Sequence, residues 1–316
     1  MTYMMKFVWL LPIIHVIFAM TSFFSGYIII VAKNLTDPIL PYISDGGAAA
    51  PQSGIFGQFL NMAAVILGIV VHIRHMQLRV FYNYNGDRPP WNKLNDVLLV
   101  IGYITAFGMS LVANFQEFTI PIGHFFGAMG AFFCGLIYIW GQIVISLMKK
   151  PRLAPQWLIY VRIGIAILST LSLILHLLTQ WTMLFVEKDA NGAMPKYTRP
   201  THIERYTSDS PFYVRHLITT SAEWLLVLSM EVQFLTYSWD LKNFSLKWLE
   251  LEYLGELVEG GRIDIRTNKF KDHKDIMNPS TISSFPRIRN NPFANIAFTG
   301  ETTEDYPTPN SDTLHF

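Results

Sequence analysis

Two carboxyl groups lie inside one long apolar run of this chain. Glu223 and Glu231 are eight residues apart, and at about 100° per residue they share one broad face of a helix. An ionisable side chain inside a membrane span is costly and needs a partner or a function. Counting along the neighbouring run predicts that Arg162 meets Glu231 and that His176 meets Glu223. Such contacts would either fix the packing of two helices or contribute to a site for a lipid headgroup or a proton.

A second polar group comes from two segments that flank apolar runs. The Pro- and Gly-rich stretch 38–61 carries a tyrosine, an acid and an amide, and the turn at 114–124 adds a glutamine and a histidine. Carboxylates and an imidazole on one membrane face would hydrogen-bond a lipid headgroup, and the acids favour an amine-bearing one. The lipid-headgroup candidates are Tyr42, Asp45, Asn61, Gln116, His124, His176 and Glu223. Alternatively, Asp45 only caps a turn through the backbone amides of Gly46 and Gly47.

The sequence favours a non-catalytic protein. The headgroup candidates show no close His-x-x-His or Glu-x-x-His spacing of the kind that metal sites use. The one cysteine, Cys134, lies within an apolar run without a nearby histidine, and no Gly-x-Ser-x-Gly motif occurs. We therefore expect no catalytic residue, no metal and no cofactor other than a bound phospholipid.

Membrane helices are the elements that would position these residues. The chain has 316 residues, of which 51% are hydrophobic and 15% charged, and this composition fits a polytopic membrane protein better than a soluble domain. A helix needs about 20 apolar residues to cross the hydrocarbon core. The runs that qualify are Phe7–Ala32, Gly54–Ile73, Asp96–Phe115, Ile120–Leu147, Trp157–Val186 and His216–Trp239. We predict an all-α integral membrane protein with a bundle of six transmembrane helices.

A stripe of small residues marks one face of the fourth run. It consists of Gly123, Gly127, Gly130 and Ala131. Small residues let membrane helices approach closely. The stripe indicates tight packing within the monomer or, as the alternative, a contact in a homodimer.

Basic residues in the short loops predict the orientation. Lys and Arg are concentrated after the second and fourth runs, whereas the loop after the first run holds only Lys33 and the loop after the third holds none. Because cytoplasmic loops carry the excess of Lys and Arg, both termini are predicted to be cytosolic. The Pro41–Pro51 segment then forms a luminal or exterior cap, on the same side as the Val186–Arg215 loop. Asn34 begins a glycosylation sequon on that side, directly after the first span.

The chain beyond the membrane domain at 1–240 has a different character. Residues 241–261 predict a cytosolic helix, since apolar residues recur at roughly helical spacing and two glycines end the run. Residues 262–316 are polar, rich in Asn, Thr, Ser and Pro, and predicted to be a disordered cytosolic tail. This helix and tail are the expected contact with a membrane or cytosolic protein complex. The net charge of +1 argues against a nucleic-acid partner.

Several motifs occur in the order seen in one family of membrane proteins. They are Pro41-Tyr42-Ile43-Ser44-Asp45, Pro51, Phe56-Gly57, Leu60-Asn61, Asn114-Phe115-Gln116, His124, Gly127-Ala128, Phe132, Gly135, Tyr138, Gln142, Ser221-Ala222-Glu223-Trp224, Phe234, Thr236 and Asp240. Over about residues 7–240, the chain resembles the Frag/DRAM/Sfk family of six-span membrane proteins. Gly46 stands where that family usually has Thr, and Gln52 where it usually has Glu, so no role that needs the Glu charge is carried over.

The resemblance implies a role in lipid biology. It favours a non-catalytic protein that binds membrane lipid and organises a lipid-handling, phosphoinositide or autophagy-related complex. The alternatives are an enzyme or co-enzyme of lipid or glycosylphosphatidylinositol-anchor remodelling, and a lipid-shuttling protein. The implied location is an endomembrane (lysosome, endoplasmic reticulum or Golgi) or the plasma membrane.

Overall fold

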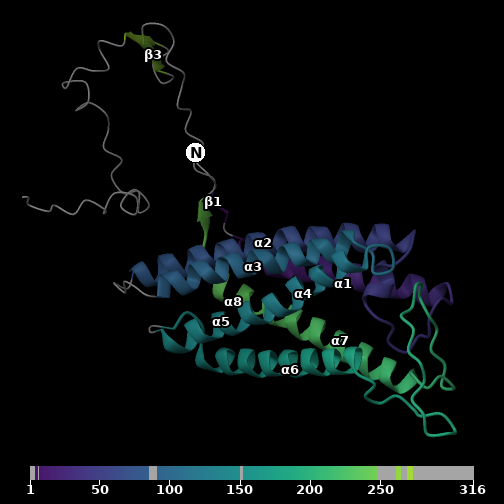
Figure 1. The fold of residues 1–316 in the computed structure, drawn as a ribbon. Helices are drawn as coiled ribbons and strands as arrows, with labels where there is room; N and C mark the ends of the chain where they lie inside the picture. The colour runs from purple at the N-terminus through teal and green to yellow at the C-terminus, as the bar shows by residue number, and fades with distance from the viewer. Residues whose placement is uncertain are drawn as a thin grey trace, which may run out of the picture. The chain divides into compact units, whose positions relative to one another are not determined.

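The computed structural model describes residues 4–5, 7–84, 91–149, 152–247, 261–264 and 269–272. The chain divides into two compact units, residues 1–248 and 249–316. The first unit is a bundle of long helices (Figure 1). The described residues of the second unit form one antiparallel pair of strands, β3 (Gly261–Asp264) with β4 (Lys269–Asp272).

The helices of the first unit follow the apolar runs of the sequence closely. They are α1 (Leu10–Ala32), the 3₁₀ turn η1 (Ser44–Gly47), α2 (Gln52–Tyr84), α3 (Trp91–Asn114), α4 (Pro121–Met129), the π-helix η2 (Gly130–Cys134), α5 (Gly135–Met148), α6 (Gln156–Trp181), α7 (Tyr213–Leu235) and α8 (Tyr237–Leu241). Pro121 and Pro155 lie at the starts of α4 and α6, where a fixed φ and a missing amide donor cost least.

Within the part of the chain that the structure describes, five helical segments are long and apolar enough to cross a membrane. They are Leu10–Ala32, Gln52–Phe81, Asn92–Asn114, Pro121–Met148 and Gln156–Trp181. This finding supports a helical multi-pass membrane protein. With 23 residues α7 has the length of a span, but it carries two glutamates and is not among the five. A sixth crossing therefore stays a prediction.

Close helix packing holds the bundle together. Helices α1, α2 and α3 pack in sequence order, and α6 packs along α7 (Figure 1). The hydroxyl groups of Ser169 and Ser229 share a hydrogen bond of 2.6 Å across the α6–α7 contact. A Cβ atom on Gly108 of α3 would lie 2.7 Å from the carbonyl oxygen of Gly127 on α4. In this structure, the small residues of the fourth span therefore serve packing within the monomer.

The two ends of the membrane unit lie at one end of the bundle, which we call the terminal face. Strand β1 (Met4–Met5) pairs with β2 (Leu246–Lys247) there. The helix predicted over 241–261 is described at residues 241–247 and at Gly261. A turn after α8 leads into β2 in the first part, and Gly261 begins β3. Residues 248–260, and the predicted tail apart from the residues of β3 and β4, lie outside the described residues. We call the opposite end of the bundle the cap face.

A buried charge cluster joins three helices near the terminal face. The Nη1 atoms of Arg74 and Arg162 lie 2.6 and 3.0 Å from Oδ2 of Asp240. Both guanidinium groups also lie over the ring of Tyr237, at 5.2 and 5.3 Å from its centroid. Gln77 donates a hydrogen bond to the Asp240 carbonyl. The cluster fixes α2 and α6 against α8.

The predicted pair of Arg162 with Glu231 is wrong. Arg162 instead contacts Asp240 and donates to the hydroxyl and carbonyl oxygens of Thr236. Glu231 lies 3.1 Å from Nε2 of His15 on α1. Counting residues along two helices gives their relative depth, but it does not show that α8, which follows α7 directly after Thr236, places an aspartate beside Arg162.

Removal of Asp240 should destabilise the bundle strongly. Asp240→Ala would leave two buried arginines without their carboxylate, and breaking a buried ion pair costs about 3–5 kcal/mol. We expect a large fall in the thermal unfolding temperature of the purified protein. The matched control is Asp96→Ala, because the Arg79–Asp96 pair is about half exposed and such pairs contribute only about 0–1 kcal/mol. Equal losses in the two variants would contradict a structural role for the cluster.

Candidate functional site

The segment between α1 and α2, residues 33–51, folds back over the helix ends and is called the cap. Its η1 turn packs so closely on α1 that a Cβ on Gly46 would lie 2.9 Å from the Cα of Gly26. Indole Nε1 of Trp224 donates to the Pro41 carbonyl at 2.8 Å. Tyr27 donates to the Pro38 carbonyl at 2.8 Å. These contacts hold the cap on α1 and α7.

Three acidic side chains accept hydrogen bonds from the cap, and one of them, Asp45, belongs to the cap itself. The backbone amide of Ile43 donates to Glu223 Oε2 at 3.3 Å, and the Ser44 hydroxyl donates to Glu117 Oε2 at 2.7 Å. Asp45 Oδ2 accepts from the amide of Tyr42 at 3.2 Å. Asp45 and Glu223 are each only 6% exposed. The cap thus gathers acidic side chains from η1, α7 and the turn between α3 and α4.

These carboxylates lie on the wall of one cavity of about 740 Å³, called the cap cavity. Helices α4 and α6 form two of its sides, and the loop 182–212 contributes a further side with Tyr197, Arg199, His202 and Tyr206. Arg215 also lies on the wall, where its guanidinium donates to the carbonyls of Thr179 and Gln180. The cavity has the size of a small-molecule site and combines acidic, basic and aromatic surface.

Burial and mutual repulsion make ionisation unfavourable for Asp45 and Tyr42 on the acidic side of the cavity. Burial raises the pKa of the Asp45 carboxyl well above its usual range, and the charge on Glu117 raises this pKa further. The Tyr42 amide opposes part of this effect. Burial and the charge on Glu223 also raise the pKa of the Tyr42 phenol well above its usual value. A cation placed among these carboxylates would relieve their repulsion.

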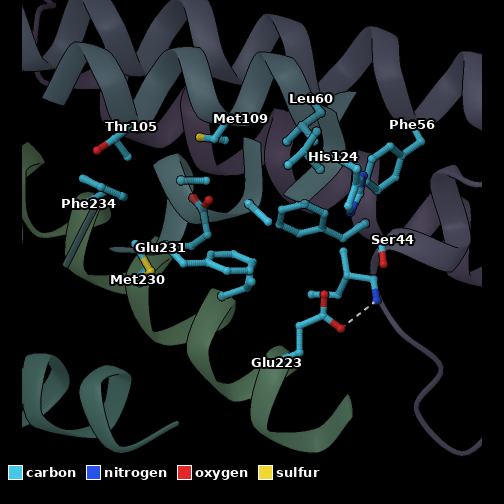
Figure 2. Close-up of a pocket in the computed structure, with 17 residues that line it drawn as sticks. Ser44, Phe56, Leu60, Thr105, Met109, His124, Glu223, Met230, Glu231 and Phe234 are labelled. Atoms are coloured by element: carbon cyan, nitrogen blue, oxygen red, sulfur yellow. Dashed lines mark hydrogen bonds between the residues drawn. The ribbon is translucent and has the colours of Figure 1, made fainter. Parts of the chain in front are cut away.

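A smaller apolar slot of about 80 Å³ adjoins the cap cavity inside the bundle. The two share five wall residues, which are Ser44, His124, Ala128, Phe132 and Glu223. Glu223 and Glu231 both reach into the slot from α7, among aromatic and aliphatic side chains (Figure 2). Glu231 is paired there with His15. The slot therefore connects the polar wall of the cap cavity with the Glu231–His15 contact within the helices.

Five of the seven predicted headgroup residues lie on the cap cavity. They are Tyr42, Asp45, His124, His176 and Glu223. The predicted contact of His176 with Glu223 is wrong, because His176 Nδ1 lies 3.1 Å from the Thr219 carbonyl. The alternative role of Asp45 as a turn cap is present in part, although the amide belongs to Tyr42 rather than to Gly46 or Gly47.

Asn61 and Gln116 are not on the walls described for the cap cavity or the slot. Asn61 instead accepts from Ser110 and Asn114 between α2 and α3. Gln116 accepts from Thr119 within its own turn. Its neighbour Glu117 is the residue that faces the cap. Sequence reasoning did not select Glu117, and adjacent residues of a turn give no signal for which side chain points inward.

The glycosylation candidate and the paired histidines of α2 each contact a residue that is distant in the sequence. Asn34 Oδ1 accepts a hydrogen bond of 2.9 Å from Arg205 of the loop 182–212. His72 and His75 show His-x-x-His spacing on α2, but their Nδ1 atoms lie near Tyr103 and Asn95 respectively. Among the described residues, no group of three or more His, Cys, Asp or Glu side chains is placed to hold a metal ion.

Comparison with known proteins places the chain in a family. A model described as the Frag1/DRAM/Sfk1/Cwh43P N-terminal domain matches residues 7–244. The chain belongs to the Frag1/DRAM/Sfk1 family.

Two groups of named relatives match most of this Frag1/DRAM/Sfk1 chain. It is 33% identical over 238 residues to DNA damage-regulated autophagy modulator protein 2 of Bos taurus. The aligned residues make up 75% of this chain and 85% of the relative. It is 27% identical over 240 residues to DNA damage-regulated autophagy modulator protein 1 of Homo sapiens, with 75% and 92% covered. The modulator of macroautophagy TMEM150B of Danio rerio is 36% identical over 155 residues, with 48% and 64% covered. No solved structure matches the chain significantly.

The raised pKa of Asp45 predicts a pH-dependent stability. The folded protein holds this proton where the unfolded chain, with a pKa of about 3.9, has lost it. The contribution of Asp45 is therefore full below that pKa and is lost as the pH rises through the folded pKa. Asp45→Asn keeps an acceptor for Tyr42 but does not ionise.

We expect wild-type protein to lose stability relative to Asp45→Asn as the pH rises from 5 toward 8, by up to about 1.4 kcal/mol per pH unit. Thermal unfolding at several pH values measures this difference. Glu187→Gln, at an exposed position outside the cavity, serves as the control. Parallel curves for wild type and Asp45→Asn would show that this carboxyl is not strained.

Proposed function

We propose that this protein is a non-catalytic membrane protein that binds an amine-bearing phospholipid in the cap cavity and supports an autophagy-related, lipid-handling complex. The observation that carries the proposal is the meeting of Asp45, Glu117 and Glu223 on the wall of one large cavity at a membrane face. Aromatic and aliphatic side chains form much of the remaining wall. This combination fits an amphipathic ligand with a cationic group.

Charge complementarity favours an amine over a bare phosphate. Clustered carboxylates that are mostly buried gain most from a partner that is itself positive and donates hydrogen bonds. Ethanolamine lipids supply such a group, and choline lipids supply the charge. Arg199 on another part of the wall provides a complementary group for the lipid phosphate. The cap cavity therefore suits a zwitterionic headgroup.

The family supports the cellular side of the proposal. Relatives that share most of this chain are named autophagy modulators, and the membrane unit corresponds to the family domain. We place the cap on the luminal or exterior side and the terminal face in the cytosol, since the basic loops lie toward that face. Residues 241–316 would then recruit the cytosolic or membrane partner. An endomembrane of the autophagy system is the location that fits these relatives best.

Glu117→Gln and Glu223→Gln should each reduce the lipid that co-purifies with the protein. Gln keeps a hydrogen-bond acceptor for Ser44 or Ile43 but removes the charge. We expect a loss of about tenfold or more in bound phosphatidylethanolamine, since a hydrogen bond to a charged group contributes roughly 1.5–3 kcal/mol. Native mass spectrometry of the intact protein measures the bound lipid. Glu187→Gln is the matched control and should bind as wild type does.

The same preparation separates this proposal from its rivals. Binding of free ethanolamine as tight as that of the lipid would show that the site serves a soluble amine. Turnover of an added phospholipid or anchor lipid by the isolated protein would show an enzyme. Unchanged lipid content in both Gln variants, with normal folding, would refute the headgroup site.

A further inference from the structure

The wall of the cap cavity is interrupted by an apolar opening between α4 and α6. Ile122, Phe125 and Phe126 of α4 and Leu177 and Trp181 of α6 all lie on the cavity wall. Yet Ile122 is 71%, Phe126 64% and Trp181 69% exposed. A side chain with most of its surface free is not enclosed by protein. The cavity therefore reaches the protein surface here, at the cap-face ends of two segments that qualify as membrane spans.

One aromatic contact bridges this opening. The rings of Phe125 and Trp181 meet edge to face, with their centroids 6.0 Å apart. Such a pair contributes about 0.5–1.5 kcal/mol, which is little enough for thermal opening. The Phe125–Trp181 contact involves only side chains. The two helices that carry it are packed on different neighbours, α4 on α3 and α6 on α7.

The two helices that flank the opening are each packed closely against another helix. Helix α4 is held on α3 by close backbone approach at Gly108 and Gly127, and α6 is held on α7 by the Ser169–Ser229 hydrogen bond. Directly after α4, the π-helix η2 interrupts the fourth span, and such interruptions are frequent at functional sites. Side-chain movement at Phe125 and Trp181 can therefore widen the opening without unpacking either helix pair.

We propose that the opening between α4 and α6 is a lateral portal, through which a phospholipid places its headgroup in the cap cavity while its acyl chains stay in the bilayer. This inference rests on the proposed function, the binding of a lipid headgroup in that cavity. The acidic groups at the inner end and the apolar side chains at the outer end match the two ends of one lipid molecule. A soluble amine would gain nothing from the apolar part.

A cross-link across the portal tests this directly. The double variant Phe125→Cys/Trp181→Cys, in a Cys134→Ser background without other cysteines, is delipidated and joined with a bifunctional maleimide. It is then mixed with phosphatidylcholine vesicles that contain phosphatidylethanolamine with a photoreactive acyl chain. We expect the cross-linked protein to lose most of the lipid capture shown by the same variant without cross-linker. Captured lipid should map to peptides of α4 and α6.

A matched pair controls for cross-linking itself. Trp157 and Trp239 also meet edge to face, at 5.8 Å, and neither lies on the wall of the cap cavity. Joining Trp157→Cys/Trp239→Cys in the same background should leave lipid capture unchanged.

The outcomes separate the portal from the proposed function. Equal capture with and without the Phe125–Trp181 cross-link, sensitive to Glu223→Gln, would overturn the portal and keep the headgroup site. Absence of capture in every form, wild type included, would overturn both. Glycerophosphoethanolamine, which lacks acyl chains, should bind the cross-linked and free forms equally if the cavity remains folded.

Discussion

A carboxylate buried inside a helical bundle requires a hydrogen-bond donor, and the cap provides one for Glu223. The amide of Ile43 reaches this side chain at 3.3 Å, while the adjacent Trp224 donates to the backbone at Pro41. Two neighbouring residues of α7 thus position the cap, which in turn sets the roof of the cavity beneath it. Together with the packing of Gly46 on α1, these contacts hold Ser44 where its hydroxyl donates to Glu117.

The same constraint acts at two further depths. Glu231 meets His15 of α1, and Asp240 of α8 meets arginines from α2 and α6. Polar side chains of the last helical segment therefore contact the cap and three other helices in turn. The polarity that keeps α7 from qualifying as a span by composition is the property that lets it organise the bundle.

Much of the helical architecture could be predicted from the sequence, because apolar runs of sufficient length leave few alternatives to membrane helices. The cap was also predictable, since proline and glycine at 38–51 exclude a continuous helix. The partner of each buried charged side chain could not be predicted in this way. The pair of Arg162 with Glu231 was expected from depth alone, but rotation about the helix axis decides which carboxylate is reached, and the arginine meets Asp240 of α8 instead.

In the candidate site, too, some residues could be predicted from the sequence and others could not. Tyr42, Asp45, His124 and Glu223 were selected by residue type and membrane side, whereas His176 was selected by a contact with Glu223 that does not form. All five lie on one cavity. The choice of Gln116 over Glu117 failed because neighbouring turn residues differ only in direction. The wall formed by 197–206 was missed because that loop has no periodic pattern and its contacts are with distant parts of the chain.

The most direct test of this account is an experimental structure of the protein in nanodiscs of native lipid. The account predicts density for a headgroup within hydrogen-bond distance of Glu117 and Glu223 under the cap, continuous with acyl-chain density that leaves between α4 and α6. A cavity filled by side chains or by ordered water, with lipid density confined to the outside of the bundle, would contradict it.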